Sequence, residues 1–414
     1  MTAGYPMLHK QRRRAASLRP TSRTLALALL AILILAALYA LTRGSPPPDP
    51  PGLIAEARKA LAAGHYSAAR QKAQAAVTAA PRAAAAHVLL ARADLMLDDG
   101  LAAEAELDRA ARLGAPAAAL HTLRANALLL QGDTDGASGE VARASPRSVS
   151  AARVRARVLA ARGDPAAADR ALTAIVAAVP TDGAAWTDLA RLRLTAGDVA
   201  GAAQAGARAV ASARHDPAAL TLGGEIVRLR FGLVAALPWF RAALARDPAY
   251  HPALIEYAAS LGDLGRGAAM LAATRYAMAA RPGSPQALYL QAVMAARAGR
   301  LDLARRLLQR TGGAIDGMPG VMLLSGSLDF ARGDYDQATV TWRRLVAAQP
   351  RNLAARRLLG TAILRAGDPQ GALDTLAPIV ARADADSYTL RIAARASERT
   401  GDRPTAATLL DRAA

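Results

Sequence analysis

A glycine that ends an alanine-rich run returns along this chain every 34 residues, and that period constrains the fold more than any other feature. One place in the series is skipped, and Phe231 stands there with Gly232 beside it. A small or apolar residue lies five residues after each place, and a proline often lies seventeen after it. The three sets are Gly163, Gly197, Gly265, Gly299, Gly333, Gly367 and Gly401; Ala168, Ala202, Ala236, Met270, Ala304, Ala338, Ala372 and Ala406; and Pro180, Pro248, Pro282 and Pro350. Such a period indicates stacked copies of one small unit.

Each part of the period has a mechanical role in a unit of two antiparallel helices. The glycine takes the left-handed conformation that closes the first helix. The Asp that often follows, as in Gly163-Asp164 and Gly333-Asp334, caps the second helix. The alanines let the two helices approach closely, and the proline ends the second helix. Because no unit can bury its apolar face alone, the units must stack.

The composition agrees with a helical fold. Alanine and leucine dominate the chain and aromatic residues make up only 4% of it. Alanine and leucine are strong helix formers, whereas β-branched and aromatic runs typical of strands are nearly absent. The sequence therefore predicts an all-α protein.

The repeat resembles the tetratricopeptide repeat (TPR) family. The order and spacing of that family's signature are matched in two stretches, Trp186, Leu189, Ala190, Gly197, Ala202 and Ala209, and Gly333-Asp334-Tyr335, Ala338, Trp342, Leu345 and Pro350. The resemblance implies a right-handed α-solenoid of about eleven helix pairs over residues 53–414, regular from 149 onward. Between residues 118 and 149 the period shortens to 31. Most units lack the family's large aromatic residues, so we expect shallow, alanine-lined contacts.

The N-terminal region follows another pattern. Leu25 to Leu41 is an unbroken apolar run, and a helix over residues 24–42 would extend roughly 28 Å, close to the thickness of a bilayer core. We predict a basic cytoplasmic tail (1–23), a transmembrane signal-anchor helix (24–42), a Pro-rich linker (43–52) and the solenoid (53–414). Six cations precede the run, so the positive-inside rule places the N-terminus in the cytoplasm and the solenoid in the periplasm of a bacterium. A cleaved signal peptide is the competing interpretation.

The sequence offers no catalytic, cofactor-binding or metal-binding constellation. The chain has no cysteine, its six histidines are scattered, and no phosphate-binding glycine motif is present. Asp133-Thr134-Asp135-Gly136 resembles a calcium loop, but its glycine comes too early and we interpret it as a turn. Trp186, Phe240 and Trp342 have the spacing of core residues, and Trp239 stays undecided. We predict that the chain is not an enzyme and needs no cofactor.

The remaining candidate site is electrostatic. In TPR solenoids the first helix of each unit lines a concave groove, which implies such a groove here. First-helix arginines predicted to face it are Arg153, Arg157, Arg191, Arg228, Arg297, Arg357, Arg365, Arg391 and Arg395. Arg153/Arg157 and Arg391/Arg395 are i,i+4 pairs, whose mutual repulsion an anionic partner would relieve. A solvated basic surface is the competing interpretation. The family's chaperone-binding clamp is not supported, because Thr122 replaces its first lysine and only Asn126 fits.

We expect a membrane-tethered scaffold for protein–protein interaction, in an envelope assembly, polysaccharide export or secretion system. The partner would be a protein, acidic where it meets the groove; no nucleic acid is expected. The arrangement is similar to TPR proteins that accompany exopolysaccharide and exosortase (PEP-CTERM) loci. Two alternatives remain open. One is a cytochrome c maturation scaffold that holds apocytochrome, and the other is the non-catalytic part of a longer enzyme.

The C-terminal helix is predicted to expose an apolar stripe of Ala406, Leu409, Leu410 and Ala413. A solenoid generally needs a polar cap on its last unit. We therefore expect that the natural protein extends further, or that this end docks on a partner or on a second copy of the chain.

Overall fold

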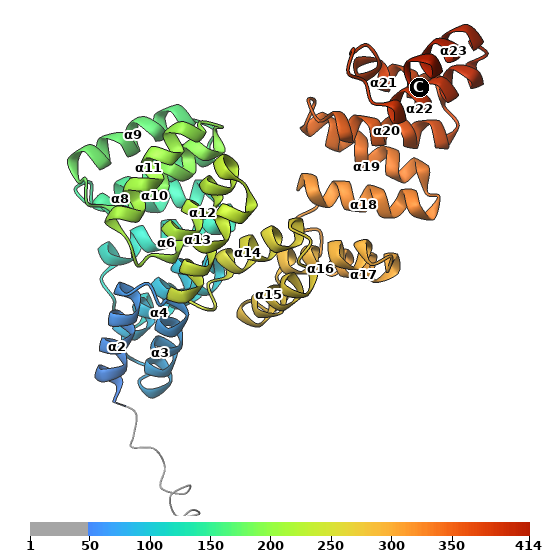
Figure 1. The fold of residues 1–414 in the computed structure, drawn as a ribbon. Coiled ribbons are helices and arrows are strands. Elements are labelled where there is room, and N and C mark those ends of the chain that lie inside the picture. The colour runs from blue at the N-terminus through green and yellow to red at the C-terminus, as the bar shows by residue number, and fades with distance from the viewer. Residues whose placement is uncertain (1–48) are drawn as a thin grey trace, which may run out of the picture. The chain divides into compact units, whose positions relative to one another are not determined.

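The computed structural model describes residues 49–414, and every regular element in that part is an α-helix (Figure 1). The prediction of an all-α fold with about eleven helix pairs is confirmed there. The helices are α2 (Pro50–Ala62), α3 (Tyr66–Ala79), α4 (Ala84–Met96), α5 (Gly100–Arg112), α6 (Ala117–Gln131), α7 (Thr134–Arg143), α8 (Val149–Ala161), α9 (Pro165–Ala178), α10 (Gly183–Thr195), α11 (Val199–Ser212), α12 (Pro217–Phe231), α13 (Leu233–Arg246), α14 (His251–Asp263), α15 (Gly267–Ala280), α16 (Pro285–Arg297), α17 (Leu301–Gln309), α18 (Pro319–Arg332), α19 (Tyr335–Ala348), α20 (Leu353–Ala366), α21 (Pro369–Val380), α22 (Ser387–Thr400) and α23 (Arg403–Arg412).

The predicted membrane helix at 24–42 lies outside the described residues. Between residues 49 and 414, none of the helices combines the length and the hydropathy needed to cross a bilayer. Within the described residues α2 comes first, and it begins at Pro50, inside the stretch predicted as linker.

The predicted period is visible in the backbone and in the core. All seven periodic glycines have positive φ, from 71° at Gly299 to 98° at Gly367. At the skipped place Gly232 supplies the positive φ (88°), while Phe231 ends α12 with its ring exposed. The eight residues expected between paired helices, from Ala168 to Ala406, are all buried. The period therefore sets both the turns and the helix contacts.

An aspartate follows five of the seven periodic glycines, and four of these aspartates cap the second helix, among them Asp368, which accepts from the Gly371 backbone N–H. Asp164, Asp198 and Asp402 each accept a hydrogen bond from a backbone N–H at the start of the next helix. The prediction is wrong for Asp334, whose side chain makes no capping bond and lies 3.9 Å from the Arg332 guanidinium instead.

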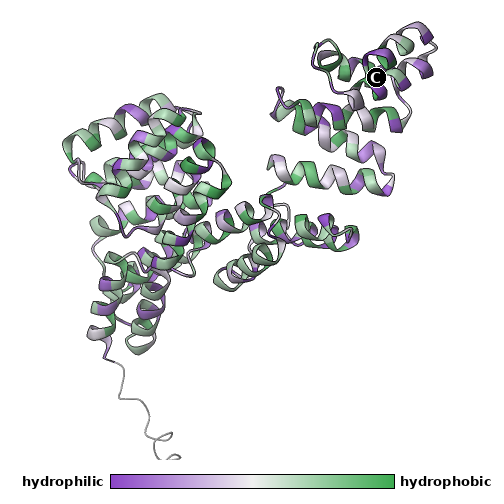
Figure 2. Cartoon of the chain, in the orientation of Figure 1, coloured by the Kyte–Doolittle hydropathy of each residue, from purple (hydrophilic) through white to green (hydrophobic). Residues whose placement is uncertain are grey.

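Large side chains fill the core where the facing helix offers a glycine. Trp342 of α19 is 1% exposed and packs on Gly326 of α18, where an added Cβ would overlap the indole ring. Phe240 is likewise fully buried. The prediction that Trp186 is a core residue is wrong in part. Its ring is half-buried at the edge of a cluster, because its indole nitrogen reaches out to donate to the Pro180 carbonyl (2.8 Å). Hydrophobic and hydrophilic residues alternate along the helices of the whole stack (Figure 2).

The stack curves toward its first helices. Most neighbouring first helices, such as α10, α12 and α14, contact one another, whereas successive second helices make no comparable contact. The even-numbered helices thus line the inner face and the odd-numbered ones the outer face. Three second helices, α7, α17 and α23, are short. The ten residues of α7 account for the predicted shortening of the period, and α17 has only nine.

The last helix pair covers most of its own apolar stripe. Ala406, Leu409 and Ala413 are buried against α21 and α22, and only Leu410 is exposed. The prediction of an exposed stripe is wrong for the first three, because the last helix packs on its own pair through them.

Candidate functional site

Three predicted groove arginines form a ladder of ion pairs along the inner face. Each pairs with a carboxylate on the next first helix. Arg153 of α8 meets Asp188 of α10 (2.9 Å), Arg191 of α10 meets Glu225 of α12, and Arg228 of α12 meets Glu256 of α14 (2.5 Å). Each of these arginines therefore has a carboxylate of the neighbouring unit as its partner. The charges of the three pairs are balanced within the chain.

Two further groove arginines are held by neutral acceptors. Arg157 donates to the Asn126 side chain (2.5 Å) on α6. Arg297 donates to the Gly262 carbonyl (2.6 Å), with Asp263 3.6 Å away. Both bonds reach back to the preceding first helix, so these side chains also connect one unit to the next.

The C-terminal part of the inner face differs. Arg357 of α20 lies 3.4 Å from Asp386 and 5.6 Å from the centre of the exposed Tyr388 ring. Arg365, Arg391 and Arg395 are exposed, and within residues 49–414 no carboxylate lies within ion-pair distance of any of them. The inner faces of α20 and α22 therefore carry arginines that the chain itself leaves unmatched. We call these three residues, Arg365, Arg391 and Arg395, together with the paired Arg357, the C-terminal arginine face.

The sequence predicted the arginines but not the acids that pair with them. Asp188, Glu225 and Glu256 stand 35, 34 and 28 residues after their partners. An acid about one period after each of these three arginines was the available signal in the sequence.

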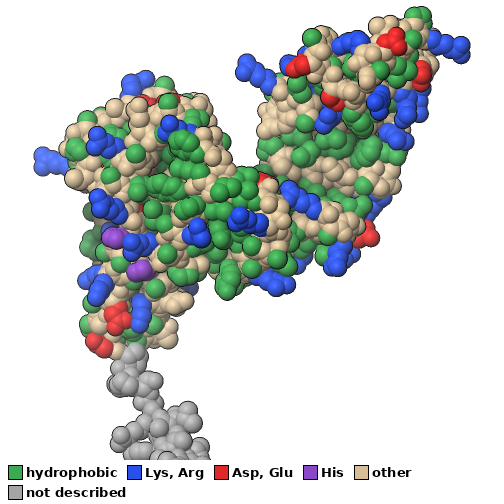
Figure 3. Space-filling model, viewed as in Figure 1, with side chains coloured by type: hydrophobic (Ala, Val, Ile, Leu, Met, Phe, Trp, Pro, Cys, Tyr) green, Lys and Arg blue, Asp and Glu red, His purple; other side chains and the backbone are tan. Residues whose placement is uncertain are grey.

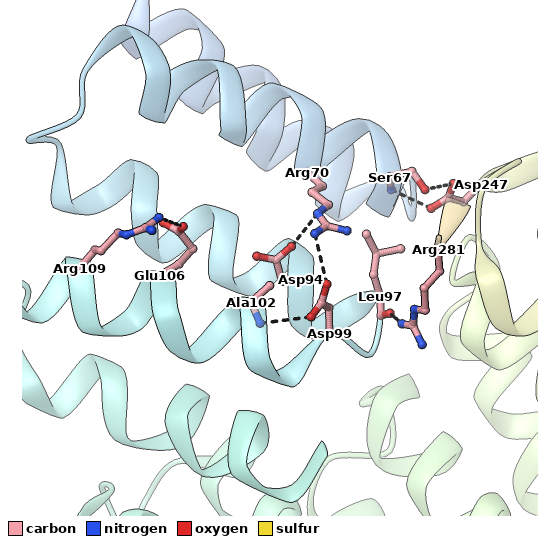
Figure 4. A network of polar contacts seen from close by, with 10 residues as sticks. All are labelled: Ser67, Arg70, Asp94, Leu97, Asp99, Ala102, Glu106, Arg109, Asp247 and Arg281. Carbon is pink, nitrogen blue, oxygen red and sulfur yellow. Dashed lines mark hydrogen bonds and ion pairs between the residues drawn. The ribbon is translucent and has the colours of Figure 1, made fainter. Parts of the chain in front are cut away.

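A second set of contacts joins units far apart in the sequence. Residues at the start of α3 and the end of α4 touch the turns before α12, before α14 and after α15 (Figure 4). The approach is close, since a Cβ on Gly64 would overlap the His215 carbonyl. We call these contacts the clasp, made by residues 64–67 and Leu97 on one side and by residues 215–217, 246–251 and Arg281 on the other. The clasp closes the units from α3 to α14 into a ring.

Polar side chains buried in the clasp find partners across it. Asp247 is 1% exposed and accepts from the Ser67 backbone N–H (2.8 Å) and hydroxyl (2.6 Å). Tyr66 donates to Asp216 (2.9 Å), and Arg281 donates to the Leu97 carbonyl. Burial, together with the Asp216 charge, raises the pKa of Tyr66, so its hydroxyl stays a donor. Burying a carboxylate without such partners would cost free energy of folding. The partners of the buried Asp247 therefore indicate that the clasp is a specific contact of the fold.

The hollow inside the ring holds one further carboxylate. Asp98 follows α4 with φ at 57°, the one positive φ of a residue other than glycine within 49–414. Its side chain is open to solvent, but the protein around it raises the pKa of its carboxyl, an effect that Arg281, Arg157 and Arg191 oppose. Asp98 therefore lies within electrostatic reach of arginines from three different helix pairs.

Residues 153–217 and 323–388 match the family model described as "Tetratricopeptide repeat". These two segments are tetratricopeptide repeats. The resemblance seen in the sequence is confirmed for them, and the helix pairs between and around them repeat the same architecture. No curated protein matches the chain.

Solved structures extend the likeness in fold. The human IFIT1 dimer with PPP-AAAA is 14% identical, covers 84% of this chain and 86% of its own, and has a TM-score of 0.51. The match to the APC/C hetero-tetramer Cut9-Hcn1 has 14% sequence identity and a TM-score of 0.42. It covers 86% of this chain and 91% of the matched chain. The match to a tetratricopeptide repeat protein from Parabacteroides merdae has 17% sequence identity and a TM-score of 0.38. It covers 56% of this chain and 91% of the matched chain. Identities this low show the fold alone.

The N-terminal helix pairs also hold a buried carboxylate with a shifted pKa. Asp94 is 2% exposed, beside the Arg70 guanidinium (2.8 Å). Burial raises the pKa of Asp94 to about 7, although Arg70 opposes that shift. In the folded chain this carboxyl therefore holds its proton well above the pH at which it ionises in an unfolded chain. In residues 49–414, no three His, Cys, Asp or Glu side chains are grouped so that they could bind a metal.

Asp94→Asn should flatten the pH dependence of stability. The raised pKa contributes stability that is complete below about pH 4 and is lost as the pH rises through about 7, on the order of 2–4 kcal/mol. We expect the melting temperature of the parent chain to fall relative to that of Asp94→Asn across this window. His251, with its pKa lowered to about 4 by burial, acts in the opposite direction in both chains and cancels in the comparison. Parallel melting curves from pH 4 to 8 would contradict the assignment.

Proposed function

We propose that this chain is a protein-binding scaffold whose C-terminal arginine face captures an acidic segment of a partner protein. TPR proteins generally mediate protein–protein interactions. The observation that supports this site is the contrast along the inner face. From α8 to α14 each ladder arginine is matched by an acid of the chain, whereas Arg365, Arg391 and Arg395 are exposed and unmatched.

Both the charge and the exposed side chains at the C-terminal end favour binding of an acidic segment there. Arg391 and Arg395 lie one turn apart on α22, so their like charges repel at a small cost that a carboxylate between them would remove. Tyr388 adds an exposed ring on the same helix, with Arg357 over it. A segment that combines acidic side chains with an apolar one would pair with the guanidinium groups and cover the ring.

Replacing Arg391 and Arg395 by Glu should weaken binding of an acidic peptide about tenfold or more, since 1.4 kcal/mol corresponds to a factor of ten. The test is fluorescence anisotropy of the full chain with a labelled Glu- and Asp-rich peptide. A matched peptide with Gln and Asn in place of the acids serves as reference. Binding by the parent should fall with added salt, because exposed ionic contacts are screened.

The matched control is Arg306→Glu with Arg310→Glu. These side chains are exposed at α17 and the turn after it, among the second-helix elements. The same change of charge there should leave the affinity unchanged. Equal loss in both variants would indicate a general effect of net charge, and no loss in either would mean that the C-terminal arginine face is an ordinary solvated surface.

We further propose that residues 24–42 anchor this scaffold in a bacterial inner membrane, with the solenoid in the periplasm. The proposal rests on the apolar run and on the six cations before it. A reporter that is active only in the periplasm, fused after Ala414, should be active. Activity of a cytoplasmic reporter at the same point would contradict this orientation, and release of the chain by a signal peptidase would contradict the anchor.

A further inference from the structure

Three consecutive second helices on the outer face, α11, α13 and α15, contain no Asp or Glu. Exposed arginines lie on them at Arg208, Arg241 and Arg275, and beside them at Arg230 in the last turn of α12 and at Arg266 before α15. The acids that follow these elements are engaged elsewhere. Asp247 is buried in the clasp and Asp263 lies beside Arg297. The charged side chains of these three helices are therefore all arginines, and the exposed Asp198 lies at the start of α11.

The clasp adds a fourth helix to this face. Each of the other second helices contains an acid except α3, and α3 is the one that the clasp brings against the turns of α13 and α15. Residues of both sides, among them Arg70 on α3 and Tyr276 on α15, line one cavity of about 600 Å³. Acid-free helices from distant parts of the sequence thus meet on one surface.

Large apolar side chains project from the same region. Tyr276, Phe231, Val234 and Leu229 are 61–67% exposed, and they are four of the five most exposed large apolar side chains in residues 49–414. The Arg230 guanidinium lies 5.0 Å from the centre of the Phe231 ring. Over α13 to α15, hydrophobic side chains make up much of the surface, with Lys and Arg side chains among them (Figure 3). A protein surface rarely presents this combination without a partner.

We infer that this outer face, formed by α3, α11, α13 and α15 with the α12–α13 turn, docks on an anionic lipid bilayer. Arginines near a negatively charged membrane surface are attracted to it electrostatically. Aromatic and aliphatic side chains beside them enter the boundary between headgroups and acyl chains. The apolar side chains are spread over the end of α12, the start of α13 and α15, and such a spread suits a broad, soft surface. An acidic protein would have to supply a separate pocket for each of them.

The absence of cysteine from the chain gives a direct test. Phe231→Cys and Tyr276→Cys are labelled singly with an environment-sensitive fluorophore in the full chain. Leu101→Cys is the control, since Leu101 is 71% exposed but lies on α5 beside Glu104 and Asp108. Each labelled chain is reconstituted with vesicles of phosphatidylcholine alone or of phosphatidylcholine mixed with phosphatidylglycerol. We expect a blue shift, and quenching by brominated lipid, at positions 231 and 276 only with the mixture.

Arg241→Gln with Arg275→Gln should abolish that shift while leaving acidic-peptide binding at the C-terminal arginine face unchanged. Circular dichroism establishes that each variant is folded, and Val234→Cys replaces any probe variant that is not. Equal spectra in both vesicle types, or an equal response at position 101, would overturn the inference. A shift with soluble polyglutamate and none with vesicles would also overturn it, and would assign the face to an acidic protein.

Discussion

Trp342→Ala is expected to lower the opening free energy of α18, α19 and α20 by about 3–5 kcal/mol, as is usual when a fully buried large aromatic side chain is removed. The indole is 1% exposed and packs on Gly326 and Phe330. Because the glycine has no side chain that could move into the space, a cavity should remain. Native-state hydrogen exchange of the full chain, followed helix by helix, measures the change.

The same experiment also provides internal controls. In a solenoid each unit contacts only its neighbours, so the loss should spread to the adjacent pairs and fade before α8 to α11. Phe231→Ala removes an exposed ring of similar size and should change no helix by more than about 0.5 kcal/mol. A uniform loss along the chain would contradict the local coupling assumed here.

Asp247→Ala is expected to open the clasp. The substitution leaves the Ser67 backbone N–H and hydroxyl without their acceptor, at a cost of about 1–3 kcal/mol for each buried group left unpaired. Exchange at residues 65–72 should rise at least about tenfold. The protection of α18 to α23, which the clasp does not touch, should stay unchanged.

Asp384→Ala is the matched control, because Asp384 is an exposed aspartate in a turn and pairs only with the nearby Arg382. Ser67→Ala should reproduce part of the effect of Asp247→Ala, since it removes one of the two bonds. If Asp247→Ala left residues 65–72 as protected as in the parent, the clasp would contribute nothing to closing the ring.

The sequence predicts what one unit and its immediate neighbours determine. A positive φ at Gly367 and a fully buried Ala202 follow from a period of 34, because each repeats a local requirement. Contacts between distant units follow no such rule. Nothing near Ser67 or Asp247 in the sequence shows that they will meet, since that depends on the summed rotation of the units between them. The pairing of Arg191 with Glu225 lies between these cases, one period apart and visible only once inward-facing positions are known.

The clasp also changes how this solenoid should fold. In an open repeat array all contacts are short in sequence, so folding can start anywhere and end units can be lost singly. Here Ser67 meets Asp247 across 180 residues, and forming so distant a contact is slow because the intervening chain must be ordered first. We therefore expect the units from α3 to α14 to unfold as one cooperative block. Truncation should remove helix pairs from the C-terminal side one at a time, whereas deletion of α2 and α3 should weaken the whole block.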